Sequence, residues 1–97
     1  MTIVIVGSPD ARWVGPATKL LREHGDDVVH LEDVAIVGLL LLSEKIAAVI
    51  VDGDSVPTNW SSLRDQMLEI SPNTRILVIA RDDASTPEQL VRRIRGP

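Results

Sequence analysis

Residues 46–57 read IAAVIVDGDSVP, and this stretch decides the fold. It starts as an unbroken apolar run over residues 46–51 and ends in two carboxylates, Asp52 and Asp54. A short apolar run rich in β-branched residues is typical of a strand that is buried on both faces, as in the middle of a parallel sheet. Ligands of open α/β sheets bind just beyond the carboxyl ends of such strands. The stretch therefore places an acid where this architecture does its chemistry.

The composition limits the class of protein. The chain has 97 residues, 44% of them hydrophobic and 25% charged, which predicts a single domain over residues 1–97. It has no cysteine, which excludes disulfides and thiolate metal sites. No apolar run approaches the roughly 20 residues of a membrane span, and the start, MTIVIVG, lacks the features of a signal peptide. We therefore expect a cytoplasmic protein, and the net charge of −4 argues against general binding to nucleic acid.

Four apolar segments predict strands, and each is followed by a segment with helical spacing. The predicted strands cover residues 2–7, 27–31, 46–51 and 75–80. Because crossovers between parallel strands are right-handed, this alternation predicts an α/β domain of three layers with helices on both faces of the sheet. The expected strand order is 2-1-3-4, as in flavodoxin-like folds. The second strand is expected at an edge, and the chain ends where a fifth strand would follow.

The start of the first helix has two interpretations. Ser8 fits an N-cap that is followed by a proline at the first helical position. Alternatively the helix starts at Pro16, because proline disfavours helical backbone before it and lacks a backbone donor. In the second case residues 8–14 form a loop over the carboxyl edge of the sheet that carries Arg12 and Trp13.

The second predicted helix, residues 33–45, has apolar side chains around most of its circumference. It is either buried over a wide face or it exposes leucines, and wide burial is the interpretation we favour. An exposed patch would instead mark a surface for a partner. The leucines that such a patch would contain are Leu39, Leu40 and Leu42.

The last two predicted helices have clear local signals. One follows Thr58 or Asn59 as its N-cap, and Ser71 and Pro72 end it. Its apolar stripe consists of Trp60, Leu63, Met67 and Ile70. The other opens with TPEQ at residues 86–89, which is a capping box with proline at the first helical position.

Three segments resemble response-regulator receiver domains. LLREHG at residues 20–25, with the two valines that follow it, is similar to the first helix and second strand of that family. AVIVD at residues 48–52, with Pro57 five residues on, is similar to its third strand and phosphoacceptor aspartate. SPNTRILVIA at residues 71–80 is similar to the run into its fourth strand. The resemblance spans nearly the whole chain and implies a receiver-like fold with Asp52 in the place of the phosphoacceptor.

The resemblance fails at residues that carry phosphotransfer. Receiver domains have an acidic pair after strand 1 that holds magnesium, whereas this chain has Gly7 and Ser8 there and Asp10 out of register. Ile79 stands where the family has a switch threonine or serine, and the lysine and aromatic residue of the fifth strand have no counterpart. These departures imply a pseudo-receiver, a regulatory module that contacts proteins independently of phosphorylation. The alternative is a phosphoacceptor that uses Asp52.

The acids after the third strand also have a structural interpretation, because acids there commonly shape the turn that follows. A pocket at the strand ends would be lined by Gly7, Ser8, Asp10 and Asp54. His24 and His30 have no third ligand at metal spacing. We therefore expect no metal site, no cofactor and no enzymatic activity.

The first third of the chain is also similar to small Rossmann-like domains that bind nucleotides or CoA. VIVGSPD at residues 4–10 has a glycine after the first strand, which lets the backbone approach a phosphate at a helix N-terminus. There is no G-x-G-x-x-G, because the next glycine is Gly15. This second alternative places a ligand loop between Gly7 and Pro16, with Arg12 and Trp13 in it.

Two features of the sequence predict a homodimer. The strand at residues 75–80 is apolar, lacks proline and interior charge, and would form an edge that includes Val78. The leucines of residues 39–42 cannot all face one sheet. Either surface could join two copies about a two-fold axis, and the basic end of the last helix would then meet acids of the other copy. Its basic residues are Arg92, Arg93 and Arg95.

Overall fold

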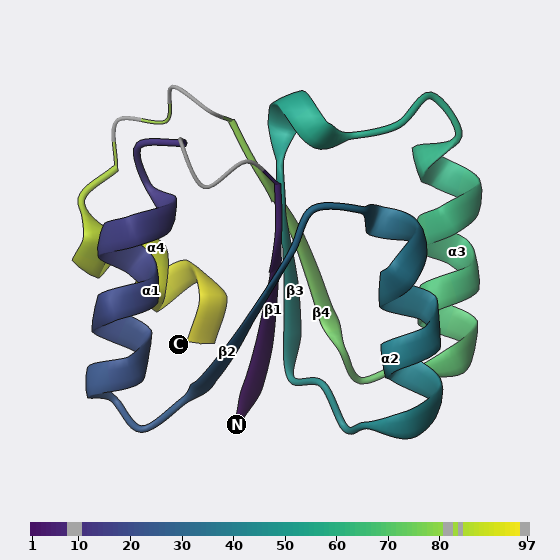
Figure 1. The fold of residues 1–97 in the computed structure, drawn as a ribbon, viewed down its shortest axis with the longest axis horizontal. Coiled ribbons are helices and arrows are strands. Elements are labelled where there is room, and N and C mark those ends of the chain that lie inside the picture. The colour runs from purple at the N-terminus through teal and green to yellow at the C-terminus, as the bar shows by residue number, and fades with distance from the viewer. Residues whose placement is uncertain (8–10, 81–82, 84, 96–97) are drawn as a thin grey trace.

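The computed structural model describes residues 1–7, 11–80, 83 and 85–95 and has three layers, with a parallel sheet between two layers of helices (Figure 1). The sheet has four strands in the order β2-β1-β3-β4. Their bounds are β1 Thr2–Val6, β2 Asp27–Leu31, β3 Ala48–Asp52 and β4 Arg75–Ile79. The predicted fold class and strand order are confirmed.

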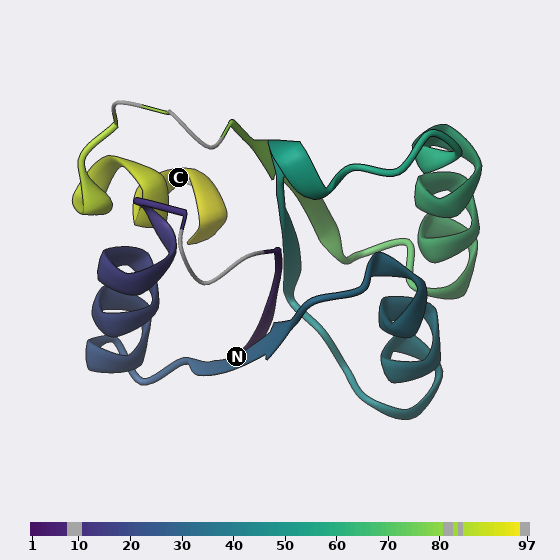
Figure 2. The ribbon, with the colours of Figure 1, turned by 45° about the horizontal axis from the view of Figure 1, so that its top comes forward.

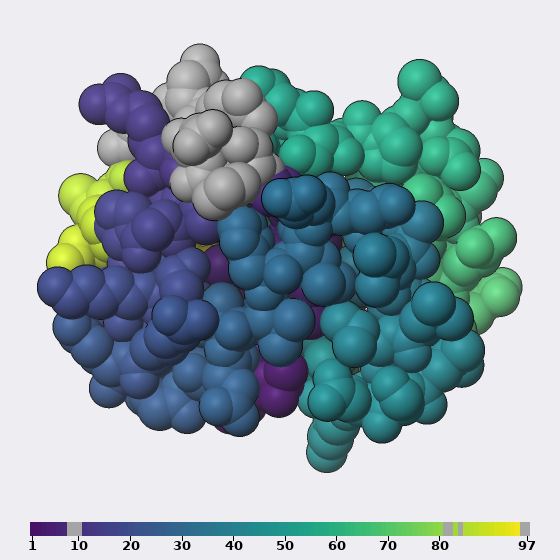
Figure 3. All heavy atoms as spheres, in the orientation of Figure 1, coloured from purple at the N-terminus to yellow at the C-terminus, as the bar shows by residue number. Residues whose placement is uncertain are grey.

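The helices divide into two pairs, one on each face of the sheet (Figures 1 and 2). Helices α1 (Val14–Glu23) and α4 (Pro87–Arg95) pack together on one face, and α2 (Val37–Ser43) and α3 (Trp60–Ile70) on the other. Two short 3₁₀ turns, η1 (Val34–Ile36) and η2 (Gly53–Ser55), precede α2 and follow β3. Figure 3 shows the side of the molecule on which β2 lies between α1 and α2. No described helix is long and apolar enough to cross a lipid bilayer.

The two central strands form the middle of the core and contribute to both of its halves. Side chains of a strand alternate between its faces, so one set packs under α1 and α4 and the other under α2 and α3. The first set consists of Ile3, Ile5, Ala48 and Ile50. The second consists of Val4, Val6, Val49 and Val51. This two-sided burial explains the unbroken apolar run of β3.

Helix α1 begins at Val14, so neither of the two predicted starts is correct. Its first α-helical hydrogen bond runs from the Ala17 N–H to the Trp13 carbonyl, 3.0 Å. Pro16 therefore lies within the first turn, where its missing N–H would have no helical acceptor. Ser8, the other candidate, lies outside the described residues.

Helix α2 is shorter than predicted and is not buried over a wide face. Asp33 caps the η1 turn before it, because its Oδ1 accepts a hydrogen bond from the Ala35 N–H at 2.9 Å. Val37 and Leu41 face the core, whereas Leu39 and Leu42 are 67% and 70% exposed. The interpretation of wide burial is therefore wrong, since one sheet face can cover only one side of a helix.

The last two helices follow their local signals with two exceptions. Asn59 precedes α3, but its side chain makes no capping hydrogen bond, whereas Met67 is buried as predicted. Ile70, predicted as part of the core stripe, is exposed because the helix ends there beyond the edge of the sheet. At α4 the capping box is confirmed: Gln89 N–H donates to Thr86 Oγ1 at 3.2 Å, and Thr86 N–H donates to Gln89 Oε1 at 2.9 Å.

Strand β4 was predicted to be an apolar edge strand, and only Ile79 is fully buried along it. Ile76 and Leu77 are half-buried and Val78 is 42% exposed. The reason is position: β4 is the last strand of the described sheet, and the chain then crosses to the opposite face, where α4 packs against α1.

The end of α4 is held by polar contacts at the amino edge of the sheet. Arg95 forms an ion pair with the buried carboxylate of Asp26, and the N-terminal ammonium lies 3.6 Å from the same carboxylate. Arg75 Nη1 of β4 donates a hydrogen bond to the Ile94 carbonyl at 3.1 Å. These contacts tie the last helix to β1, β2 and β4.

The Asp26 cluster predicts a measurable loss of stability on mutation. In Asp26→Ala the two cations lose their buried partner, and since both are partly exposed we expect a cost of about 1–3 kcal/mol, below that of a fully buried pair. Urea unfolding measures it, with Asp27→Ala, an exposed neighbour, changing stability by less than about 0.5 kcal/mol. Equal effects at the two positions would show that the cluster does not hold α4.

Candidate functional site

Asp52 ends β3 at the carboxyl edge of the sheet, between β1 and β4. It is 0% exposed. Its Oδ1 accepts a hydrogen bond from the Asp54 N–H at 3.4 Å, and the side chain thereby caps the η2 turn. The carboxylate thus takes part in shaping the turn after the strand, which is the structural interpretation made from the sequence.

Gly7 covers one side of Asp52. A Cβ at Gly7 would lie 2.5 Å from Asp52 Cβ and 3.3 Å from Asp52 Oδ2, and the glycine has a φ of +142°. The Gly7 N–H donates to the Leu31 carbonyl at 2.9 Å, which fixes the backbone at this point. Both the space and the backbone conformation therefore demand glycine after β1.

The end of β4 covers the other side of the turn. Ile79 pairs in register with Asp52 and is buried. A Cβ at Gly53 would lie 3.3 Å from Ala80 Cα, so the backbones after β3 and β4 approach closely. Among the described residues, Asp52 therefore lies beside the backbone of Gly7 and beside Ile79, which stands where a receiver domain is expected to carry a hydroxyl.

The structure brings together only part of the predicted strand-end pocket. Gly7 contacts Asp52, and Asp54 is exposed on the η2 turn, while Ser8 and Asp10 lie outside the described residues. Reasoning from sequence missed Ser55, whose Oγ would lie 3.2 Å from a Cβ at Gly7. The run Asp-Gly-Asp-Ser after a buried strand was the available signal, since these residues favour tight turns.

The two residues of the predicted ligand loop have different surroundings. Arg12 is exposed, whereas Trp13 is buried in the core cluster under α1 and α4. Both border a hollow of about 340 Å³ between the starts of α1 and α4. The Trp13 Nε1 atom is buried and has no hydrogen-bond partner among the described residues.

Asp83 lies on the rim of this hollow and fixes the start of α4. The Ser85 hydroxyl, then the Ser85 N–H at 2.8 Å and Arg93 at 3.4 Å, lower the pKa of Asp83 below its ordinary value. A carboxylate whose pKa is lowered by folding stabilises the folded state above its unfolded pKa, and the contribution is lost as the pH falls through the folded pKa.

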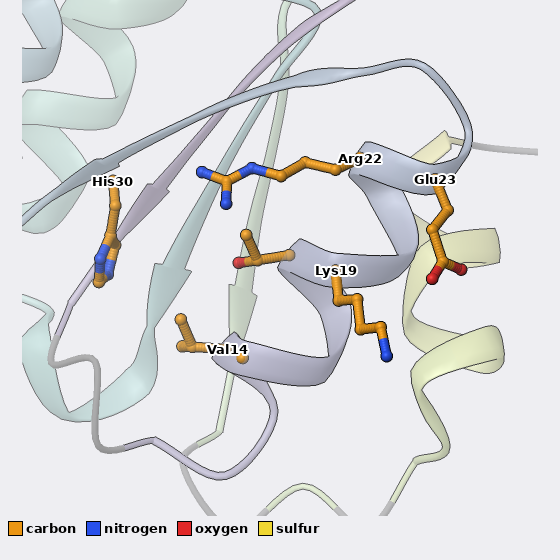
Figure 4. A pocket seen from close by; sticks show the side chains of 7 residues that line it. Val14, Lys19, Arg22, Glu23 and His30 are labelled. Carbon is orange, nitrogen blue, oxygen red and sulfur yellow. The ribbon is translucent and has the colours of Figure 1, made fainter.

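A wider hollow of about 640 Å³ lies between α1 and β2. Figure 4 shows Arg22 extending from α1 over this hollow, with His30 on its far side. His24 and His30 are both exposed. Over the described ranges no group of three or more His, Asp or Glu side chains is arranged to hold a metal ion.

The residues predicted for an interface lie on two separate surfaces. Leu39 and Leu42 are exposed on α2, and Leu40 is half-buried against the core. Val78 is exposed on β4. The sequence proposed these two surfaces as alternatives, and both expose apolar side chains.

Comparison with known proteins identifies the fold. No protein-family model and no curated protein sequence matches the chain. A solved structure of a response regulator protein from Burkholderia pseudomallei, with a phosphorylated aspartic acid, calcium ion and citrate, matches with a TM-score of 0.73 at 15% identity, over 96% of this chain and 65% of that one. A CheY-like response regulator receiver domain protein from Methanospirillum hungatei JF-1 matches with a TM-score of 0.64 at 14% identity, over 94% and 71%.

These likenesses confirm the predicted resemblance at the level of fold. The sheet order and the alternation of helices are those of a receiver-like, flavodoxin-like domain. The chain spans 65% of the length of the Burkholderia pseudomallei protein. At such low identity the likeness shows the fold alone. Any chemistry must be argued from this chain's own residues.

The contact between Gly7 and Asp52 predicts a sharp difference between two glycines. Gly7→Ala should destabilise the protein by roughly 2–5 kcal/mol, because backbone strain and overpacking each cost on the order of 1–3 kcal/mol. Gly38→Ala, where a Cβ has nothing within 4 Å, should be neutral or slightly stabilising within α2. Thermal unfolding of both variants measures this. A Gly7→Ala protein as stable as Gly38→Ala would disprove the close packing over Asp52.

Proposed function

We propose that this chain is a pseudo-receiver: a single-domain, non-enzymatic regulatory module of the cytoplasm that contacts other proteins independently of phosphorylation. The observation that carries the proposal is the complete burial of Asp52. A receiver-like fold supports a signalling role, and the enclosed acid supports a role that does not pass through a phosphoryl group.

The chemistry of phosphotransfer explains why burial is decisive. The attacking oxygen must reach the phosphorus in line with the leaving group, and the charge on the phosphoryl oxygens must be neutralised by cations. Asp52 has no exposed surface, and Gly7 and Ile79 lie beside it. A phosphoryl group on its carboxylate would require Gly7 and the η2 turn to move away from it.

The nucleotide alternative has less support than the pseudo-receiver. Its loop was expected to hold Trp13 over a ligand, but the indole is buried among core residues. Arg12 alone offers an exposed cation beside the hollow at the start of α4, and Asp83 places a carboxylate there. An anionic ligand would meet both charges.

The exposed apolar side chains support contact with proteins, and first of all with a second copy. Large apolar residues outside the core include Leu39 and Leu42 on α2, Leu68 on α3 and Val78 on β4. Single exposed apolar residues are normal, but several on one small domain favour a docking surface. We therefore include a homodimer in the proposal.

The chemical part of the proposal predicts that Asp52 stays unmodified. Incubation with acetyl phosphate and magnesium should leave the intact mass of the protein unchanged, because the carboxylate is enclosed. A receiver domain that is known to be phosphorylated serves as the positive control. A stoichiometric phosphoryl adduct that is lost in Asp52→Asn would refute the pseudo-receiver and establish the phosphoacceptor.

The proposed homodimer predicts that the protein self-associates. In sedimentation equilibrium the weight-average mass should rise from monomer toward dimer between low and high micromolar concentration, as expected for a small interface. Leu39→Glu tests the α2 surface without disturbing the core, because Leu39 is exposed, unlike the half-buried Leu40. A wild-type protein that stays monomeric throughout this range would eliminate the homodimer.

A further inference from the structure

The two edges of the sheet differ in how they are protected. On β2 the exposed side chains are Asp27 and His30. On β4 they are Arg75 and Val78, and Arg75 is drawn toward α4 by its hydrogen bond to the Ile94 carbonyl. Charges on an edge discourage pairing with another chain. From Ile76 onward, the β4 edge is therefore less protected than the β2 edge against pairing with another chain.

The backbone register of β4 shows which groups face outward. Arg75 N–H donates to the Ala47 carbonyl at 3.0 Å, and Arg75 pairs with Ala48. Because a strand directs alternate residues to opposite neighbours, Arg75, Leu77 and Ile79 bond toward β3. The N–H and C=O groups of Ile76 and Val78 point away from the sheet, and among the described residues β4 has only β3 as a neighbouring strand.

Apolar side chains lie beside these outward backbone groups. Val78 is exposed on the sheet face that α3 covers, since it alternates with Leu77, which packs under α4 and α1. On α3, Leu63 and Ile70 border hollows on the side of α2. Leu68 lies about 100° from Met67 around the helix axis, on the side away from Leu63 and Ile70. It is 37% exposed. Leu68 and Val78 are thus exposed apolar side chains of the two elements, α3 and β4, on this face of the sheet.

We infer that β4 pairs antiparallel with β4 of a second copy about a two-fold axis at Leu77, which joins the two sheets into one. This inference rests on the proposed homodimer and names its interface. Ile76 then lies opposite Val78 of the second copy, and each such pair exchanges two hydrogen bonds through the groups that point outward. Leu77 lies opposite Leu77 of the second copy.

The strand's own sequence supports a second copy as the occupant. A two-fold axis perpendicular to the sheet keeps α2 and α3 of both copies on one side, so residues opposite each other must share a face. The axis at Leu77 meets this condition and pairs the whole strand Arg75–Ile79 with itself. It sets β-branched residues against each other and Arg75 against Ile79, so no like charges are opposed. Pairing of β4 with β2 of the next copy would not close and would build a filament.

Cysteine cross-linking tests this register, because the chain contains no native cysteine. In the inferred pair the two Leu77 Cα atoms are about 4.5 Å apart, within the range of about 4.4–6.8 Å that a disulfide spans. Leu77→Cys should form a covalent dimer under mild oxidation at least tenfold faster than Val29→Cys. Val29 is the matched control, since it is the half-buried middle residue of the other edge strand.

Each outcome decides between the register and its alternatives. Equal cross-linking rates for Leu77→Cys and Val29→Cys, with a wild-type protein that sediments as a dimer, would overturn the β4 pairing and leave the homodimer to α2. Masses that grow beyond a dimer would indicate head-to-tail pairing and also overturn it. A monomeric wild type would remove the homodimer itself.

Hydrogen exchange on the wild-type protein tests the same register without a substitution in the core. The amides of Ile76 and Val78 point out of the sheet, as those of Val28 and His30 do on β2. On raising the protein concentration, exchange at Ile76 and Val78 should slow at least tenfold, while exchange at Val28 and His30 stays constant. Slowing at β2, or at neither edge, would refute the inferred pair.

Discussion

The fold depends on the need to cover β3 on both faces. Its side chains over Ala48–Asp52 are all buried, and a parallel sheet achieves this with a layer of helices on each face. Right-handed crossovers then place α1 on one face and α2 and α3 on the other. The receiver-like topology follows from this one apolar strand, and so does the position of Asp52, because the strand must end at the carboxyl edge of the sheet.

The same constraint limits what Asp52 can do. Close packing of β1 and β3 brings Gly7 against the aspartate, and the turn after β3 approaches the end of β4. A carboxylate in such a place stabilises the turn through its contact with the Asp54 N–H. Catalytic acids at strand ends instead need access to substrate and to cations. In this chain the acid at that position has no exposed surface, which is the observation behind the proposed pseudo-receiver.

The sequence predicted those features that local physics determines. The apolar run of β3, the strand order and the capping box before α4 all agree with the structure, because each depends on neighbouring residues or on handedness. The exposure of Leu39 contradicts the wide burial that was favoured for its helix, because it depends on which elements lie alongside. The burial of Asp52 could not be predicted either, because it involves a contact with Gly7, which is 45 positions earlier in the sequence.

The contacts that complete the fold also leave β4 as an edge. After β4 the chain crosses to the face of α1, where Arg95 meets Asp26 and the Ile94 carbonyl accepts from Arg75. These contacts hold α4 beside α1, and Leu77 on that face of β4 stays half-buried. Val78 lies on the face of α3 and is exposed because β4 is the last strand of the described sheet. Moving α4 to cover β4 would break the ion pair and uncover α1. The stability of the monomer and the openness of its edge therefore have the same origin.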